Sequence, residues 1–145
     1  MTGLFVIDAS VAIKLVVPEV YSVQAVALQS SQRLAAPDIL FSECANTLWK
    51  KVRRGELSEA DTAEALDVLT DMDLQVLPCR ELAQEALMLS LRLDHPAYDC
   101  LYLCLALRLD TAVVTADKRL LRKLTQTGSE WATLVRPVET FPLGS

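Results

Sequence analysis

The chain has 145 residues, 52% of them hydrophobic, so it fits one compact domain with a buried core and is not a disordered chain. Its formal net charge of −5 disfavours a protein that simply coats nucleic acid, because such proteins are usually basic. The longest apolar run, residues 100–107, is too short to span a bilayer, and the N-terminus carries no basic signal-peptide segment, so we expect a cytoplasmic protein.

The first half of the chain alternates short apolar runs with helical patterns. In chain order we expect a strand at 4–7, helices at 11–17 and 20–30, a strand at 34–36, a helix from 38 to 53 and another that starts at 58. Pro18 stops the first helix, since its ring cannot continue one. Asp38 is expected to cap the third helix and Gly55 to close it. Ser58, with Asp61 three residues later, predicts a capping box.

The second half continues the alternation. We expect a strand at 74–77, helices at 81–93 and 98–109, a strand at 112–114, a helix at 117–124, a last strand at 132–135 and a frayed tail from Pro142. Strands separated by helices imply βαβ units and a parallel sheet covered on both faces. No repeat or linker interrupts the pattern, so residues 1–145 are expected to form a single domain.

Four cysteines and one histidine restrict the chemistry open to the chain. The cysteines are Cys44, Cys79, Cys100 and Cys104, with no Cys-x-x-Cys pair, and we expect them to stay reduced. Cys100 and Cys104 share a helix face, where they could contact a soft metal, but two small core residues is the favoured interpretation. The single His95 excludes zinc sites that need two histidines and leaves a histidine-based triad without an obvious nucleophile.

Two aspartates follow predicted strands in the same way. Asp8 comes directly after the first strand and Asp117 shortly after the fourth. In an open parallel sheet, ligands bind outside the carboxyl ends of the strands. Each aspartate is equally suited to capping the next helix, with Ser10 as a competing cap for Asp8. The similar placement favours a shared edge, where Ser10 and Thr115 can hold the two carboxylates by hydrogen bonds.

Asp99 interrupts the most apolar part of the chain. The stretch 97–107 carries no other charge, and a helix that is apolar all round is a buried helix. A buried carboxylate costs several kcal/mol unless it is paired or binds a metal. A favourable place at a helix N-terminus contributes only about 0.3–1 kcal/mol. We therefore favour a functional role for Asp99 over a role at the helix end alone.

Glu43 gives a weaker signal than the three aspartates. Its helix places Phe41, Cys44 and Leu48 on the stripe that faces the core, and Glu43 falls at the margin of that stripe. From the pattern alone, a solvated surface glutamate with local partners is the better interpretation of this residue.

Carboxylates that meet at one edge of a sheet suit a hard cation. Mg²⁺ and Mn²⁺ take oxygen ligands, keep several waters and complete their coordination with phosphate oxygens. Such a site activates water and neutralises the charge that develops during phosphodiester cleavage. Despite the acidic total, two basic clusters remain: Lys50, Lys51, Arg53 and Arg54, then Lys118, Arg119, Arg122 and Lys123.

The acidic segments together resemble a known family. The segments are Val6-Ile7-Asp8-Ala9-Ser10, then 42–50, 97–106 and 114–120. They resemble the four motifs of PIN domains, and most closely those of the VapC toxins of bacterial and archaeal toxin–antitoxin pairs. Each motif is weak alone, but all four occur in order over nearly the whole chain.

The resemblance implies a fold, an activity and a set of site residues. The implied fold is a three-layer α/β/α sandwich around a parallel sheet, with the first and fourth strands adjacent. The implied activity is Mg²⁺- or Mn²⁺-dependent endonucleolytic cleavage of RNA. The acidic quartet that binds metal and catalyses would be Asp8, Glu43, Asp99 and Asp117. Supporting positions match Ser10, Asn46 and Thr115.

The resemblance also bears on partners. It implies a homodimer and an antitoxin protein bound over the active site. Lys118 and Arg119 stand where some members carry a further acid, so a complete second metal site is not implied. These two residues and Arg122 directly follow Asp117 and are candidate RNA contacts, although a solvated helix face is nearly as good an interpretation. A stripe that includes Ala63 and Leu66, beside Trp49, would suit a partner helix.

Other interpretations of the same residues remain open. A haloacid-dehalogenase-type phosphatase needs a second acid two residues after the first, where Ser10 stands. A phosphoacceptor receiver domain needs a clustered acid pair after its first strand, which this chain lacks. The main alternative is a catalytically weak or inactive PIN scaffold that binds RNA or a protein partner. The intact quartet argues against it.

Overall fold

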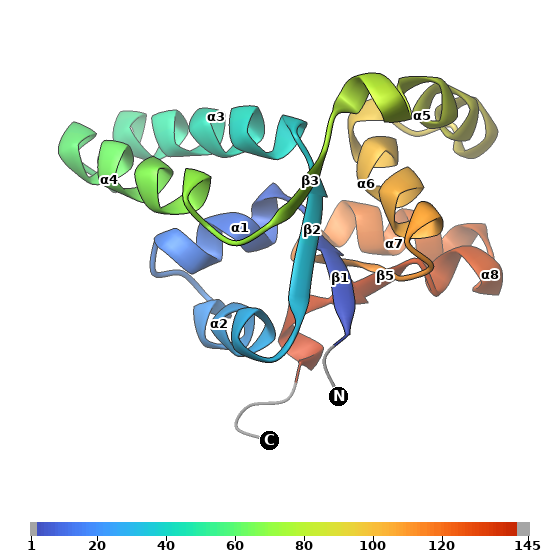
Figure 1. Cartoon of the computed structure of the whole chain (residues 1–145), viewed down its shortest axis with the longest axis horizontal. Coiled ribbons are helices and arrows are strands. Elements are labelled where there is room, and N and C mark those ends of the chain that lie inside the picture. Colours follow the sequence, from blue (N-terminus) through green and yellow to red (C-terminus); the bar gives the residue numbers. More distant parts are fainter. Residues whose placement is uncertain (1–2, 142–145) are drawn as a thin grey trace.

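A five-stranded, all-parallel sheet forms the centre of the protein (Figure 1). A computed structural model describes residues 3–141. The strands are β1 (Leu4–Ile7), β2 (Arg33–Pro37), β3 (Gln75–Leu77), β4 (Val113–Thr115) and β5 (Val135–Pro137). Their order in the sheet is β3-β2-β1-β4-β5, so β1 and β4 are neighbours at its centre. The predicted parallel sheet and the adjacency of its first and fourth strands are confirmed.

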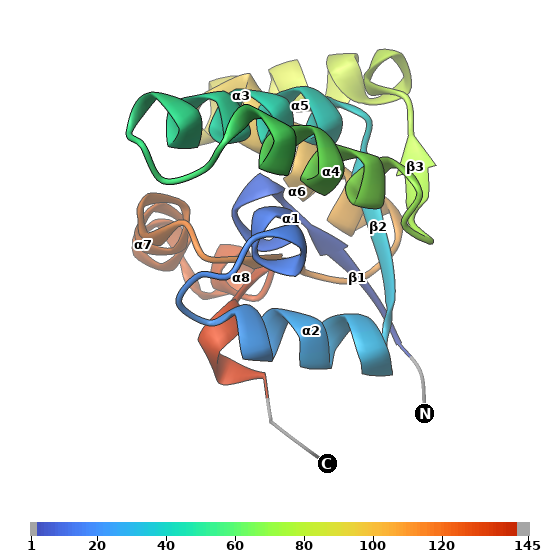
Figure 2. The same cartoon turned by 90° about the vertical axis from the view of Figure 1, so that its left-hand side faces the viewer.

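Helices cover both faces of the sheet and make three layers (Figures 1 and 2). On one face lie α1 (Ala9–Val16), α2 (Ser22–Ser31), α3 (Ile39–Arg53) and α4 (Glu59–Thr70). On the other lie α5 (Cys79–Leu93), α6 (Ala97–Arg108), α7 (Lys118–Thr127) and the short α8 (Ser129–Ala132). A 3₁₀ turn, η1 (Val138–Thr140), follows β5. This is the predicted α/β/α sandwich.

The most buried helix is α6. All seven residues from Cys100 to Ala106 are buried, and the helix packs on β1, β2 and β4. A sequence that is apolar all round excludes a solvent face, which is why this helix takes the place over the middle of the sheet. The cysteines are free thiols, and Cys44, Cys100 and Cys104 are buried, as expected of small core residues.

The ends of several elements differ from the sequence prediction. The last strand begins at Val135 rather than 132, because Ser129–Ala132 turns into α8 after Gly128. Asp38 holds the N-cap position of α3, but its carboxylate accepts a hydrogen bond from the Cys79 amide (2.9 Å) rather than from its own helix. The predicted capping role of Asp38 is therefore wrong. The tail from Pro142 lies outside the described residues.

Other local predictions hold. Ser58 and Asp61 form the expected capping box, with the Asp61 amide 3.1 Å from the Ser58 hydroxyl. Within residues 3–141, none of the helices is both long and apolar enough to cross a bilayer. The pairing of Ile7 with Val114 aligns the carboxyl ends of β1 and β4, so the residues that come after these strands meet at one edge of the sheet.

Candidate active site

Asp8 is a buried acid at the end of β1. Its side chain is 8% exposed and accepts hydrogen bonds from the Ser10 hydroxyl (2.5 Å), the Thr115 hydroxyl and the Val11 amide (3.3 Å). The Val11 contact makes Asp8 the N-cap of α1 as well. Burial raises the pKa of Asp8 from 3.8 to about 6, although the hydrogen bonds act in the opposite direction. Asp8 is thus a cap that carries a costly negative charge.

Two hydroxyls join the ends of β1 and β4. The Ser10 and Thr115 oxygens are 3.3 Å apart. Ser10 also accepts the Ala116 amide (2.8 Å), and Thr115 accepts the Asp117 amide (3.0 Å). Thr115 therefore donates to the carboxylate of Asp8 and accepts from the backbone of Asp117. This network fixes the loop after β4 against the start of α1.

Glu43 lies on α3 and points toward α6. It is half-buried, and its Oε1 accepts a hydrogen bond from the hydroxyl of Tyr102, whose side chain is buried in α6. Burial raises the pKa of Glu43, and the negative charge of Asp99 raises it further, while the Tyr102 hydrogen bond lowers it. The solvated surface glutamate that the sequence pattern favoured is therefore wrong.

Asp99 lies in the first turn of α6 beside the only histidine. Its Oδ2 is 2.7 Å from Nε2 of His95, and the two side chains are 30% and 13% exposed. Asp99 is thus less buried than the apolar sequence around it suggested. Its negative charge raises the pKa of both Asp8 and Glu43. These three acids, from β1, α3 and α6, share one electrostatic neighbourhood.

Asp117 has a different environment. It is half-buried at the N-cap of α7, where its Oδ1 accepts the amides of Arg119 (2.9 Å) and Leu120 (3.4 Å). Its link to the other acids runs through its backbone amide and Thr115. Because Oδ1 accepts both amides, Oδ2 is the carboxylate oxygen that remains for another partner.

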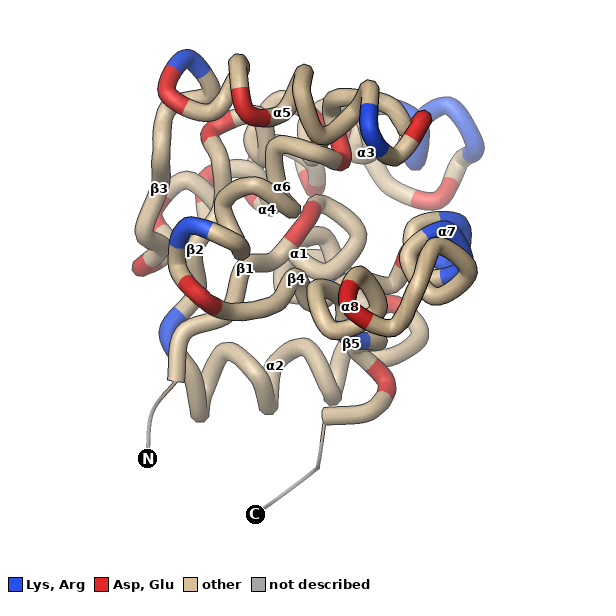
Figure 3. The backbone as a smooth tube through the Cα atoms, turned by 90° about the vertical axis from the view of Figure 1, so that its right-hand side faces the viewer, with Lys and Arg blue, Asp and Glu red and all other residues tan. Residues whose placement is uncertain are grey.

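The remaining candidate residues lie on α3 and α7. Asn46 is exposed on α3, three residues after Glu43 and therefore on the same side of the helix. Lys118, Arg119 and Arg122 are exposed on α7. Figure 3 shows basic residues on α7 and at the end of α3 on the same side of the molecule.

Comparison with known proteins identifies the family. The model of the PIN domain family matches residues 5–125, most of the chain. The chain belongs to the PIN domain family. Ribonuclease VapC3 of Pyrobaculum aerophilum is 36% identical over 121 residues, which cover 81% of this chain and 92% of that protein. Ribonuclease VapC9 of Mycobacterium tuberculosis is 32% identical over 117 residues, which cover 81% and 88%. These matches place the chain in the VapC group.

A solved structure supports the PIN fold independently. The crystal structure of PAE2754 from Pyrobaculum aerophilum matches with a TM-score of 0.69 and covers 96% of this chain and 91% of its own. Its sequence is 22% identical, so this similarity bears on the fold alone.

The oxygen donors of this PIN domain suit a hard cation. Within residues 3–141, no three His, Cys, Asp or Glu side chains already form a metal cage. Nevertheless, the charge of Asp99 acts on both Asp8 and Glu43, and no lysine or arginine of the described chain forms an ion pair with the three acids. Mg²⁺ is usually held by one or two carboxylates, waters and substrate phosphates rather than by a protein cage. The donor set therefore fits Mg²⁺ or Mn²⁺.

Sequence reasoning missed two residues of this PIN domain site. His95 was considered only as a zinc ligand or a base, and Tyr102 only as part of an apolar run. Spacing gave a signal for Tyr102, which lies three residues after Asp99 and therefore on the same side of the helix. His95 lies in the loop before α6, where no helical spacing could place it.

Proposed function

We propose that this protein is a metal-dependent endoribonuclease and the toxin of a toxin–antitoxin pair. The observation that carries the proposal is that Asp99 lies within electrostatic range of both Asp8 and Glu43, while no lysine or arginine within residues 3–141 forms an ion pair with any of the three. The names of the VapC relatives, which are ribonucleases, support RNA as the substrate.

Four acids would hold Mg²⁺ or Mn²⁺ in the proposed mechanism. Glu43 and Asp99 each use one carboxylate oxygen in a hydrogen bond and would offer the other to the ion, and Asp117 would add its Oδ2 from the start of α7. Both oxygens of Asp8 accept hydrogen bonds, and its Oδ2, which accepts only the Thr115 hydroxyl, would use its second lone pair. The bound ion would activate water and neutralise charge on the phosphodiester. Ser10 and Thr115 keep Asp8 oriented, and Asn46 stands on the same side of α3 as Glu43.

RNA would reach these acids along α7. Lys118 and Arg119 directly follow Asp117, and Arg122 lies one turn further on, all exposed. Positive side chains next to a metal site attract and position phosphates of the substrate strand. We therefore propose Lys118, Arg119 and Arg122 as contacts to the RNA backbone.

The proposed antitoxin would bind at the groove between α3 and α4. A cavity of about 250 Å³ there is lined by Trp49, Val52, Ala63, Leu66 and neighbouring side chains, and Trp49 is 52% exposed. Leu48 and Leu69, on the same two helices, are buried in the core, so the exposed Trp49 offers more surface to a partner than they do. An amphipathic helix that lays its apolar face into this groove is the expected binding mode.

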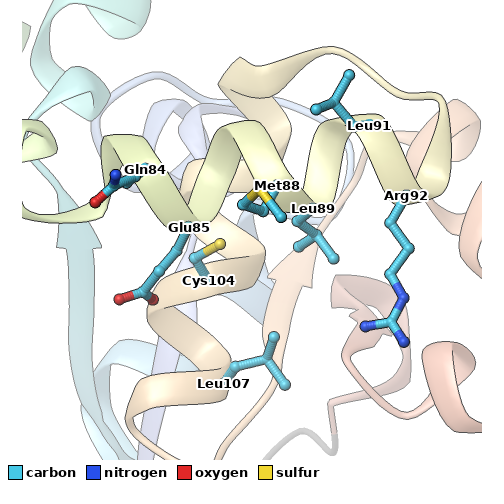
Figure 4. Close-up of a pocket in the computed structure, with 8 residues that line it drawn as sticks. All are labelled: Gln84, Glu85, Met88, Leu89, Leu91, Arg92, Cys104 and Leu107. Carbon is cyan, nitrogen blue, oxygen red and sulfur yellow. The ribbon is translucent and has the colours of Figure 1, made fainter.

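We also infer one PIN domain over residues 1–145, a homodimer and a place in the cytoplasm. For the dimer, support comes from exposed apolar side chains of α5 and α6: Leu87, Met88, Leu91 and Leu107. A cavity of about 720 Å³ opens among the side chains of these two helices (Figure 4). Light scattering of the wild type and of Leu91→Glu tests this: a dimer that the variant disrupts supports it, and a monomeric wild type contradicts it.

RNA cleavage tests the central proposal. Purified wild type should cleave total RNA in Mn²⁺ and stop in excess EDTA. Asp99→Asn should lose at least the roughly 10–100-fold that changes outside the direct ligands of a metal already cost. Asp67→Asn, at an exposed position on α4, is the matched control and should cleave like the wild type. RNA binding without any cleavage would favour the inactive scaffold instead.

A further inference from the structure

Two side chains, an imidazole and a phenol, contact acids of the site at the beginning of α6. His95 lies in the loop two residues before α6, and its Nε2 is 2.7 Å from the Asp99 carboxylate in the first turn of the helix. Tyr102 lies on α6 three residues after Asp99, so the two side chains share one side of the helix, and its hydroxyl donates to Glu43. Asp99 and Glu43 thus each have one oxygen occupied by one of these two side chains.

Hydrogen bonds to Ser90 hold the backbone of His95. Its backbone amide donates to the Ser90 carbonyl (3.2 Å), and its own carbonyl accepts the Ser90 hydroxyl (2.5 Å). Asp94, just before it, closes α5 in the left-handed region with φ of 51°. Ser90 therefore fixes both polar backbone groups of His95. A ring nitrogen of histidine can donate a hydrogen bond, and Nε2 is the one that faces Asp99.

Burial and one hydrogen bond hold the side chain of Tyr102 in place. Its side chain is 1% exposed, and a buried tyrosine hydroxyl needs a hydrogen-bond partner. Burial and the charge of Glu43 raise the pKa of Tyr102, so the phenol keeps its proton and remains a donor. The partner it finds is Glu43 on α3, 59 residues away in sequence.

We propose that His95 and Tyr102 are positioning residues that orient Asp99 and Glu43 for a divalent cation. A lysine or arginine in either place would hold the carboxylate equally well, but its charge would compete with the cation. The two side chains each contact one oxygen of their carboxylate and leave the second oxygen available for the cation. This inference rests on the proposed metal dependence.

Mn²⁺ affinity, measured by calorimetry without RNA, tests the proposal. Tyr102→Phe removes only the hydroxyl and should weaken Mn²⁺ binding about 10–100-fold, as changes to the groups that hold metal ligands do. The matched control is Tyr98→Phe, which removes the hydroxyl of a 65% exposed tyrosine on the same helix and should leave the affinity unchanged. Equal affinities of wild type and Tyr102→Phe would overturn the role of Tyr102.

A matched pair of substitutions tests His95. Gln and Met have similar length, but only Gln offers an N–H near the place of Nε2. We expect His95→Met to lose Mn²⁺ affinity about 10–100-fold and His95→Gln to retain most of it. Similar affinities of the two variants would show that the hydrogen bond to Asp99 does not matter for the metal.

A double-mutant cycle separates positioning from general destabilisation. If Tyr102 acts through Glu43, then Tyr102→Phe should cost no further Mn²⁺ affinity in a Glu43→Gln background. Additive losses would contradict this route. Since none of these measurements uses RNA, a wild type that binds Mn²⁺ but leaves RNA intact would contradict the proposed function and leave this inference standing.

Discussion

Asp8 and Asp117 follow neighbouring parallel strands, and both occupy the N-cap of the next helix. The carboxylate of Asp8 is nearly removed from solvent and is held by two side-chain hydroxyls in addition to one amide. That of Asp117 is half-buried and holds two amides of its own helix. The same local pattern therefore gives two different acids: burial disfavours the charge of Asp8, whereas the charge of Asp117 stabilises a helix.

Helix capping explains the position of Asp117 but not that of Asp8. A cap stabilises, so Asp117 needs no further reason to be where it is. Asp8 is kept although burial raises its pKa to about 6, a shift equivalent to roughly 3 kcal/mol at neutral pH. A charge kept at that cost is typical of functional sites, where a cation or substrate relieves it.

The largest expected effect is on cleavage. We predict that Asp8→Asn loses more than the roughly 10–100-fold typical of changes outside the direct ligands of a metal. Asp117→Asn should lose less, because asparagine also caps a helix and only the Oδ2 of Asp117 is left for the cation. Initial rates on one RNA at saturating Mn²⁺ measure both. Equal losses would mean that the two acids serve the ion alike and would remove the distinction between them.

The next effect is on stability without metal. In EDTA at pH 7, Asp8→Asn should raise the free energy of unfolding, by up to roughly 3 kcal/mol, because it removes the buried charge. In Mn²⁺ the wild type should gain about 2.7 kcal/mol at a hundredfold excess over Kd, and the variant should gain less. Denaturant titrations in both buffers give the four values. A variant less stable than wild type in EDTA would make Asp8 a simple cap.

The same burial predicts a pH window. The folded state holds the Asp8 proton up to about pH 6 and the unfolded state only to about pH 4, so the folded protein binds more protons between these values. In EDTA, the stability of wild type relative to Asp8→Asn should therefore fall as pH rises from 4 to 6 and stay constant above. A difference that is flat across this range would contradict the raised pKa.

A smaller effect of opposite sign is expected at Asp117. Asparagine keeps the cap but loses the negative charge at the N-terminus of α7, so Asp117→Asn should lower stability in EDTA by about 0.3–1 kcal/mol. Thermal melts beside Asp8→Asn measure this directly. If both variants melt higher than wild type, then the charge of Asp117, like that of Asp8, destabilises the folded state, and the two acids do not differ in this respect.

Much of the fold could be predicted because it rests on local pattern. Short apolar strands between helices predicted the parallel sheet, and the charge-free run after Asp99 predicted the burial of α6. The short α8 and η1 were missed, since three or four residues are too few to show a helical period. The carboxylate of Asp38 finds its partner 41 residues away, which no local capping rule can anticipate.

The candidate site shows the same limit. Positions after strands pointed to Asp8 and Asp117, because parallel strands end at one edge. The environment of Glu43 could not be predicted, since its burial depends on Tyr102, 59 residues away. Tertiary packing decides that Glu43, at the margin of the apolar stripe of α3, faces α6 rather than solvent.

The smallest predicted effect concerns the side chains next to each aspartate in the sequence. Asp8 is followed by apolar residues and Ser10, whereas Asp117 is followed by Lys118 and Arg119. Because basic side chains attract phosphates, we propose that RNA contacts the protein at the end of β4. Each phosphate contact to a single strand contributes about 0.7 to the slope of log K against log salt, so losing Arg119 and Arg122 together should flatten it by about 1.4. Binding is measured in Ca²⁺ or EDTA, so that no RNA is cleaved.

The matched control is the exposed pair Arg53 and Arg54 at the end of α3, changed to Ala in the same way. A change in slope for the α7 pair alone ties the substrate to the end of β4. Equal changes would extend the RNA path to α3, and no change in either would leave α7 as a solvated helix face.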